Sequence, residues 1–297
     1  MSIDKIAILG GGQMGSGIAQ VAAGAGIDVV MIKATPGPAD SAKGGIEKGL
    51  SKLVERGKME QADADALLGR LSFSSDLDAA ADVDLFIESI VEDLETKREK
   101  FAAVDKLAKP DAILASNTST LSIGAMQEAT GRTSRFLGLH FFNPATMMKL
   151  VEVIPTDTTD AAVTADAVAF VERIGKTPVL VRDETGFIVN RLLTPYMLDA
   201  MRCVESGLSD IAGIDTAMQL GANHPMGPLA LADYIGLDIV IAMSENLFGS
   251  FSENYMAPTP LLKKLVADGN LGRKSGLGFY DYSSRPPVPN KALEKSS

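Results

Sequence analysis

Two side chains of this sequence could form a proton-transferring pair, His140 and Glu152. His140 is one of only two histidines in 297 residues, and it lies in the apolar run 139–142. Glu152 follows inside the next apolar run, 150–154. Because an imidazole titrates near neutral pH and a carboxylate can orient it, the pair suits general acid–base chemistry. Two alternatives stay open: His140 could be a hydrogen-bonded core residue, and Glu152 could point to solvent from an alternating strand.

A glycine-rich loop near the N-terminus could supply the partner for this chemistry. Residues 10–15 match the pattern G-x-G-x-x-G, between a strand-like run, 5–10, and a helix-like stretch, 15–25. In this context the first glycine permits a tight turn, the second lets a pyrophosphate approach the main chain, and the third lets the helix pack on the strand. The alternative is a purely structural turn. The predicted dinucleotide contacts are Gly10, Gly12, Gln13, Met14 and Gly15.

The end of the second predicted strand, 28–32, bears on the choice of dinucleotide. A carboxylate there would hydrogen-bond the adenosine ribose and repel a 2′-phosphate. The position holds Lys33 instead, with Thr35 nearby. Since lysine attracts phosphate as a point charge, we expect NADP(H) to be used at least as well as NAD(H). Alternatively, Lys33 is a solvated surface lysine and main-chain atoms contact the ribose.

A second group of cations lies on the predicted helix 41–56. Lys48, Lys52 and Arg56 recur every four residues, on the side away from the apolar positions. Such a stripe could bind the phosphates of an extended anionic ligand. It could equally be an ordinary solvated face, where charges contribute little.

Strand-like and helical patterns alternate over the first part of the chain. This alternation predicts an α/β fold in which a Rossmann-type doubly wound parallel sheet carries helices on both faces. Beyond Gly186 the pattern is helical, so we predict a dinucleotide-binding domain, 1–185, and an all-α domain, 186–297. The proline-containing tail after Tyr282 is expected to be loosely ordered. The predicted strands are 5–10, 28–32, 83–89, 112–116, 136–142, 150–154 and 178–181.

Composition excludes several classes of protein. The formal net charge of −10 argues against a basic nucleic-acid-binding surface, and no apolar run is long enough to cross a bilayer. Cys203 is the only cysteine, so no intrachain disulfide is possible. The N-terminus lacks the pattern of a signal peptide, so a cytoplasmic protein is expected. We predict no metal site.

Six motifs occur in a fixed order, at residues 10–15, 115–120, 140–144, 186–191, 224–228 and 272–276. They carry a family resemblance that covers about residues 5–282. Together they resemble the short-chain 3-hydroxyacyl-CoA dehydrogenases, and among these the bacterial 3-hydroxybutyryl-CoA dehydrogenases. The resemblance implies hydride transfer between NAD(P) and C3 of an acyl-CoA, interconverting (S)-3-hydroxybutyryl-CoA and acetoacetyl-CoA in fatty acid and butanoate metabolism. It also implies a substrate-binding role for the helical domain and a homodimer formed through it.

The resemblance also assigns roles to single residues. His140 would be the general acid–base and Glu152 its orienting partner, while Ser119 and Asn190 would hydrogen-bond the reacting oxygen. From local pattern alone, Ser119 is equally suited to cap a helix, and Asn190 is an ordinary helical residue. His224 is interpreted as structural, in a proline-rich turn. The remaining implied contacts are Asn143, Glu92 and Lys97 with the dinucleotide, and Lys52 and Arg56 with the adenine-nucleotide end of CoA.

Two other functions stay open. A hydroxyacid dehydrogenase of the L-gulonate type would share the architecture, accept free acids and have no need of Lys52 and Arg56. A catalytically silent nucleotide-binding or structural protein is the third possibility, and the set of His140, Glu152, Ser119 and Asn190 argues against it.

Overall fold

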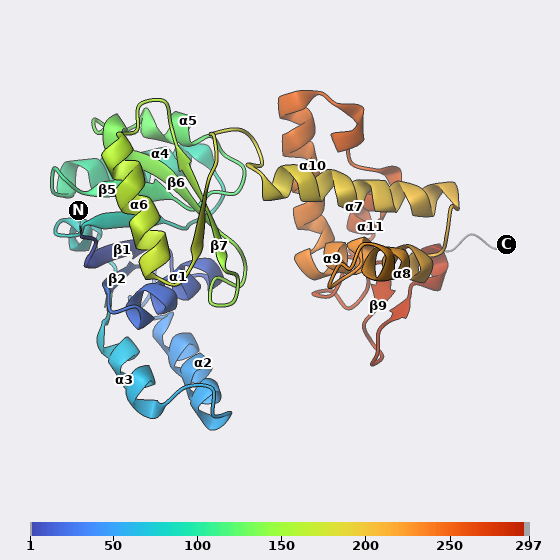
Figure 1. The fold of residues 1–297 in the computed structure, drawn as a ribbon, viewed down its shortest axis with the longest axis horizontal. Coiled ribbons are helices and arrows are strands. Elements are labelled where there is room, and N and C mark those ends of the chain that lie inside the picture. The colour runs from blue at the N-terminus through green and yellow to red at the C-terminus, as the bar shows by residue number, and fades with distance from the viewer. Residues whose placement is uncertain (1, 294–297) are drawn as a thin grey trace. The chain divides into compact units, whose positions relative to one another are not determined.

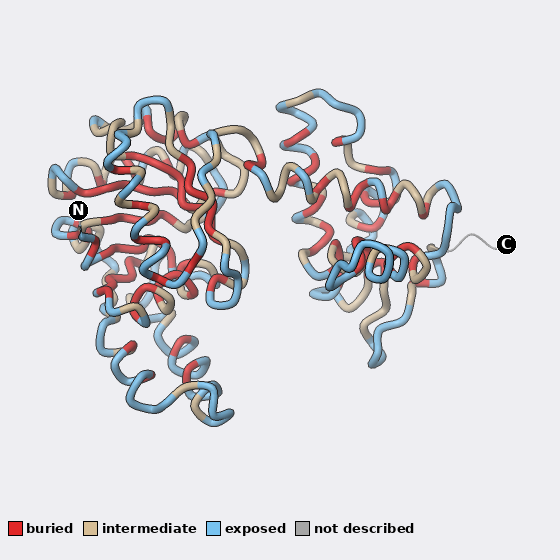
Figure 2. Tube along the Cα trace, viewed as in Figure 1, coloured by how far each residue is buried: buried red, intermediate tan, exposed pale blue. Residues whose placement is uncertain are grey.

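The chain contains two compact units, Met1–Glu184 and Thr185–Ser297 (Figure 1). The computed structural model describes residues 2–293. Each unit encloses its own cluster of buried apolar side chains, seen as the red segments in Figure 2.

The first unit is built on one eight-stranded sheet with the order β3-β2-β1-β4-β5-β6-β7-β8. From β1 the chain goes first to β2 and β3 on one side and then to β4 on the other. The strand order therefore reverses beside β1, which is where dinucleotides bind in sheets of this kind. The strands are β1 (Lys5–Leu9), β2 (Asp28–Ile32), β3 (Leu71–Ser74), β4 (Leu85–Glu88), β5 (Ile113–Ser116), β6 (Phe136–Phe141), β7 (Leu150–Pro155) and β8 (Thr177–Leu180).

All neighbouring strands of this sheet are parallel except β6 and β7. A parallel pair needs a crossover of about a dozen residues or more. The connection 142–149 is shorter, so β7 returns beside β6 as an antiparallel neighbour, and the sheet differs here from a fully parallel one. In this register His140 pairs directly with Glu152.

Helices cover both faces of the sheet. Ile18 of α1 and Phe170 of α6 join the cluster on one face, whereas Phe101 of α4 packs against the other. The Phe101 ring lies 6.0 Å from the Phe86 ring and 4.6 Å from the Phe136 ring, both edge-on. The helices are α1 (Gln13–Gly24), α2 (Lys43–Glu55), α3 (Gln61–Gly69), α4 (Leu94–Leu107), α5 (Ile123–Gln127) and α6 (Ala161–Arg173), with 3-10 turns η1 (Leu77–Ala80) and η2 (Thr133–Arg135).

The second unit is helical. Prolines start two of its helices, at Pro228 and Pro260, where the missing N–H costs nothing. Its elements are α7 (Val189–Ser206), α8 (Ile211–Gly221), α9 (Pro228–Ile235), α10 (Leu237–Phe251), η3 (Asn254–Met256), α11 (Pro260–Ala267), β9 (Tyr280–Asp281), β10 (Val288–Pro289) and η4 (Lys291–Leu293).

Residues 283–293, the described part of the segment after Tyr282, differ from the expectation of loose order, and residues 294–297 lie outside the described residues. β10 pairs with β9, and the buried Asn290 side chain donates a 2.8 Å hydrogen bond to the Gly278 carbonyl. The prolines that suggested disorder thus belong to a small hairpin that is fixed by backbone and side-chain bonds.

The predicted fold class is confirmed: a mostly parallel, Rossmann-type sheet is followed by a helical domain. The β9–β10 pair is a minor addition to the all-α description. Across residues 2–293, none of the helices combines the length and the apolar character that crossing a membrane would require.

Candidate active site

The glycine loop occupies the turn from β1 into α1. Gly10 has a φ of +120°, and a Cβ there would lie 2.2 Å from the Ser89 carbonyl oxygen. A Cβ on Gly15 would lie 2.0 Å from the Gly10 oxygen, so helix and strand meet too closely for any side chain. A Cβ on Gly12, by contrast, would meet nothing within 4 Å.

The start of α1 fits a dinucleotide pyrophosphate. Gly12 is the N-cap, and no side chain caps the helix. The first-turn N–H groups therefore remain available to an anion, next to the open space at Gly12. Gln13 and Met14 lie in this first turn, where Gln13 is exposed and Met14 half-buried.

His140, Glu152 and Ser119 form a continuous hydrogen-bonded chain. The His140 Nδ1 lies 2.7 Å from Glu152 Oε2, and its Nε2 lies 3.2 Å from the Ser119 hydroxyl. His140 is 3 % exposed and Glu152 is fully buried, so Glu152 does not point to solvent. Because a carboxylate only accepts hydrogen bonds, Nδ1 is the donor to Glu152 and Nε2 is left to exchange a proton. The Phe142 ring lies 4.5 Å from the imidazole.

Ser119 does not cap the following helix. That cap is Ser122, whose hydroxyl accepts the N–H of Ala125 at the start of α5. The Ser119 hydroxyl is therefore not committed to the helix and is directed to the imidazole instead.

Glu92 holds the loop that carries Ser119. Its Oε1 accepts the N–H groups of Ser119 and Thr120 and the hydroxyls of Thr118 and Thr120, at 2.5 to 3.1 Å. Burial alone would raise the pKa of Glu92, but the Lys97 ammonium and these donors hold it below its usual value. A charged Glu92 thus fixes the main chain on either side of Ser119.

Lys97 lies beneath Glu92 rather than at the surface. Its side chain is 1 % exposed and pairs with Glu88 at 2.7 Å and with Glu92 at 3.1 Å. Ser116 donates a 2.6 Å hydrogen bond to the other oxygen of Glu88. In this arrangement Glu92, with 38 % of its side chain exposed, separates the ammonium from solvent.

Sequence reasoning missed Glu88, Ser116 and Asn117. Asn117 donates to the Ser89 hydroxyl and accepts the N–H of Phe141, so it ties three strand ends together. The available signal was position: Glu88 and Ser116 each end a buried strand, and the carboxyl ends of neighbouring parallel strands meet at one edge.

Four predicted cations lie after β2 and on or directly after α2. Lys33 follows β2 and is half-buried; a Cβ on Gly37 would lie 2.7 Å from its ammonium, which therefore rests against the following turn. Lys52 and Arg56 are exposed on α2 and just after it, as is Lys48.

The remaining predicted residues lie elsewhere. Asn143 is exposed just after β6. Asn190 belongs to the second unit, half-buried in the first turn of α7. His224 accepts or donates a 2.9 Å hydrogen bond with the Tyr196 hydroxyl.

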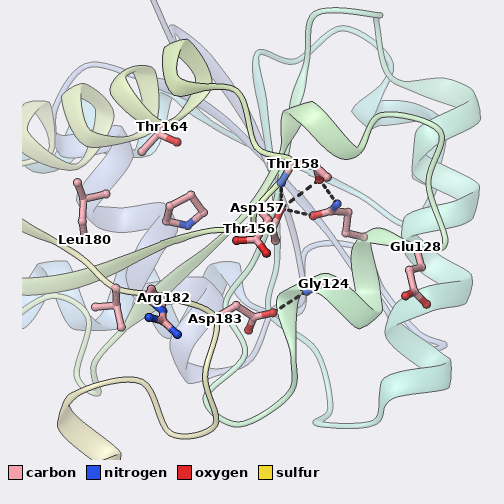
Figure 3. Close-up of a pocket in the computed structure, with 12 residues that line it drawn as sticks. Gly124, Glu128, Thr156, Asp157, Thr158, Thr164, Leu180, Arg182 and Asp183 are labelled. Carbon is pink, nitrogen blue, oxygen red and sulfur yellow. Dashed lines mark hydrogen bonds between the residues drawn. The ribbon is translucent and has the colours of Figure 1, made fainter.

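A separate hollow of about 640 Å³ lies at the ends of β7 and β8 in the first unit (Figure 3). None of the predicted site residues lines it. The Asp183 carboxylate in this hollow accepts hydrogen bonds from the N–H groups of Ile123 and Gly124 at the start of α5. The candidate site is thus the His140 edge and not this hollow.

Comparison with known proteins identifies the family. The domain described as "3-hydroxyacyl-CoA dehydrogenase, NAD binding domain" matches residues 5–184, and "3-hydroxyacyl-CoA dehydrogenase, C-terminal domain" matches residues 186–282. The chain therefore belongs to the 3-hydroxyacyl-CoA dehydrogenase family, and the predicted resemblance is confirmed.

Named relatives match over nearly the whole chain. A probable 3-hydroxybutyryl-CoA dehydrogenase of Deinococcus radiodurans is 47 % identical, covering 94 % of this chain and 100 % of its own. The mitochondrial hydroxyacyl-coenzyme A dehydrogenase of Sus scrofa is 44 % identical over 94 % and 91 % of the two chains. The crystal structure of (S)-3-hydroxybutyryl-CoA dehydrogenase PaaH1 from Ralstonia eutropha superposes with a TM-score of 0.91 at 38 % identity, covering 95 % of this chain and 100 % of that one.

Proposed function

We propose that this chain is a 3-hydroxybutyryl-CoA dehydrogenase, interconverting (S)-3-hydroxybutyryl-CoA and acetoacetyl-CoA with a nicotinamide dinucleotide. The observation that carries the proposal is the chain of hydrogen bonds from Glu152 through His140 to Ser119. The names of the relatives supply the substrate class.

His140 acts as general base in the oxidation. Its Nε2 takes the proton of the C3 hydroxyl as the C3–H bond breaks and the carbonyl forms, and in reduction it returns that proton. Glu152 keeps Nδ1 protonated and stabilises the imidazolium once Nε2 is also protonated. The bound nicotinamide ring supplies the acceptor or donor of the hydride.

Polar groups near the imidazole orient the reacting oxygen. Ser119 lies 3.2 Å from Nε2, so an oxygen that bonds to both groups is held in a fixed direction. Asn190 from the second unit is proposed as another donor to that oxygen. Asn143 and Glu92 are proposed to border the dinucleotide, with Lys97 acting through Glu92.

The dinucleotide is proposed to lie with its pyrophosphate at the start of α1 and its adenosine ribose near Lys33. No carboxylate occupies the end of β2, and the ammonium is held near the turn 35–38. This arrangement favours a 2′-phosphate, so we propose that NADP(H) serves at least as well as NAD(H).

A homodimer formed through the helical unit is also proposed. Leu192, Leu208 and Leu220 are each more than two-thirds exposed there. Leu192 also borders an apolar hollow of about 480 Å³ with Met226 and Leu231. Exposed apolar surface of this kind marks interaction sites, and the mass in solution, measured by light scattering, tests it.

The deciding experiment follows the absorbance of NADPH or NADH in the presence of acetoacetyl-CoA. We expect turnover with both, with a kcat/KM for NADPH at least equal to that for NADH. A large preference for NADH would contradict the role of Lys33. Reduction of free 3-oxo acids without the thioester would favour the non-CoA dehydrogenase, and no turnover at all would favour a silent nucleotide-binding protein.

His140→Ala tests the acid–base assignment. Loss of general acid–base transfer should reduce kcat by about 10²–10⁴-fold, while dinucleotide binding, followed by fluorescence, stays unchanged. A variant with nearly normal kcat would refute the role of His140.

A further inference from the structure

The segment that joins β6 to β7 is held by a lysine from a distant part of the chain. Lys176 lies between α6 and β8 and is only 9 % exposed. Its ammonium donates to the carbonyl of Ala145 at 2.6 Å and to that of Met148 at 2.7 Å. The next residue, Thr177, donates its N–H to the Lys149 carbonyl at 2.7 Å. Three main-chain oxygens of the segment 143–149 are thus fixed from one place.

The same segment packs against the dinucleotide-binding helix. Ala145 is 2 % exposed, and a Cβ added to Gly17 of α1 would lie 3.0 Å from the Cβ of Ala145, a distance tighter than ordinary packing. The segment therefore lies between the Lys176 ammonium and α1. Asn143 stands at its start, two residues after the end of β6.

Burying the Lys176 ammonium costs free energy that an apolar side chain at this position would not cost. Burial lowers the pKa of its ammonium, and among the described residues the hydrogen bonds recorded for that ammonium go to two carbonyl oxygens. A buried ammonium is tolerated only when its hydrogen bonds are made. The two carbonyl bonds are therefore what this lysine contributes.

We propose that Lys176 is a positioning residue for hydride transfer: it holds the segment 143–149 against α1 and so fixes Asn143 beside the nicotinamide end of the dinucleotide. The inference rests on the proposed function, because Asn143 is proposed as a dinucleotide contact. Lys176 itself touches neither substrate nor dinucleotide.

Lys176→Met tests the proposal, because methionine keeps the unbranched side chain and removes the ammonium. We expect kcat to fall and the dinucleotide KM to rise, lowering kcat/KM by up to about a hundredfold, as expected for a displaced contact. The KM for acetoacetyl-CoA should change less. Lys176→Arg, which can still donate to both carbonyls, should recover part of the loss.

Lys149→Met is the matched control, because it removes one exposed ammonium from the same segment. It should leave kcat and the dinucleotide KM unchanged. If Lys176→Met lowers only the melting temperature and matches Lys149→Met in both kinetic constants, the lysine is merely structural and the proposal is overturned.

A second variant approaches the segment from the opposite side. Gly17→Ala should displace Ala145, and we expect it to lower kcat and raise the dinucleotide KM as predicted for Lys176→Met. It therefore tests the proposal even if Lys176→Met does not fold. Its control is Gly24→Ala in the same helix, where the added Cβ would have an ordinary 3.6 Å contact with Leu67. Equal behaviour of the two alanine variants would overturn the proposal. If the wild-type protein turns over no acetoacetyl-CoA, the proposed function itself fails.

Discussion

At the scale of single residues, the proposed reaction depends on how one imidazole, that of His140, is held. Glu152 is fully buried and its strand register leaves it directly opposite His140. The tautomer is therefore set by the antiparallel pairing of β6 and β7. Since the pairing is fixed by backbone hydrogen bonds, the imidazole would lose little freedom on binding the proposed substrate.

Glu152→Gln should lower kcat by about 10²–10⁴-fold, because an amide is a poor partner for imidazolium and can stabilise the wrong tautomer. Dinucleotide affinity should not change. Steady-state kinetics and a fluorescence titration measure the two effects. Glu128→Gln removes an exposed carboxylate of the same kind and serves as the control; equal turnover in the two variants would exclude Glu152 from the proton path.

Parts of the candidate site could be predicted where the residues lie close together in the sequence. Contacts between residues that are far apart in the sequence could not be predicted. His140 and Glu152 lie on consecutive apolar runs twelve residues apart, and this spacing suggested the pair. The structure adds that the two strands are antiparallel, which places the two side chains directly opposite each other. The bonds of Glu92 to residues 118–120 join distant loops. Likewise, the burial of Lys97 depends on Glu88, which reads only as the end of an apolar strand.

At the scale of elements, the exposed face of α2 carries cations that take no part in packing the helix on the core. Ile46 and Leu50 are its buried residues, whereas Lys48, Lys52 and Arg56 are exposed. Among the described residues, the ion pair recorded on this helix joins Lys43 and Glu47. The stripe is therefore available to an anionic ligand.

Replacing both Lys52 and Arg56 by Ala should raise the KM for acetoacetyl-CoA and change kcat little, because the proposed contacts with the CoA phosphates would be the same in substrate and transition state. The KM of the wild type should also rise more steeply with salt than that of the variant. The double variant Lys263→Ala and Lys264→Ala, on α11, removes the same charge and is the control. An unchanged KM would mean that Lys52 and Arg56 do not bind the substrate and belong to an ordinary solvated face.

Element prediction failed where the local pattern was weak. β3 was not predicted, because Leu71–Ser74 is short and only partly buried, with no continuous apolar run. It becomes a strand through pairing with β2 at the sheet edge. The antiparallel direction of β7 was also not predicted, although the connection 142–149 is too short for a parallel crossover.

At the scale of the whole molecule, the chain carries a net charge of −10 and still buries two carboxylates in its helical unit. Asp215 accepts the N–H groups of Leu229 and Ala230 at the start of α9. Asp233 accepts those of Phe279 and Tyr280 and the Tyr282 hydroxyl. The two acids thus attach α9 to α8 and to the C-terminal hairpin.

Burial is the main cause that raises the pKa of Asp233, and the nearby Asp215 charge adds to it; the result is about 6, against 3.8 for the ordinary group. A raised pKa means that the folded state binds the proton more tightly than the unfolded state. The contribution of Asp233 to stability is therefore complete below pH 3.8 and is lost as the pH rises through about 6. At pH 5, one unit below that pKa, it is about 1.4 kcal/mol.

The difference in unfolding free energy between the wild type and Asp233→Asn should therefore shrink by about 1.4 kcal/mol when the pH is raised from 5 to 8. Denaturant titrations at several pH values measure it.

Self-repulsion of the acidic chain also changes with pH, but it acts on both proteins and largely cancels in the difference. The variant has its own constant cost, because an amide offers one acceptor where Asp233 has two. Asp268→Asn, which removes a half-exposed carboxylate, is the control. A difference for Asp233→Asn that is flat from pH 5 to 8 would mean that this carboxylate is already ionised throughout, because its three donors outweigh its burial.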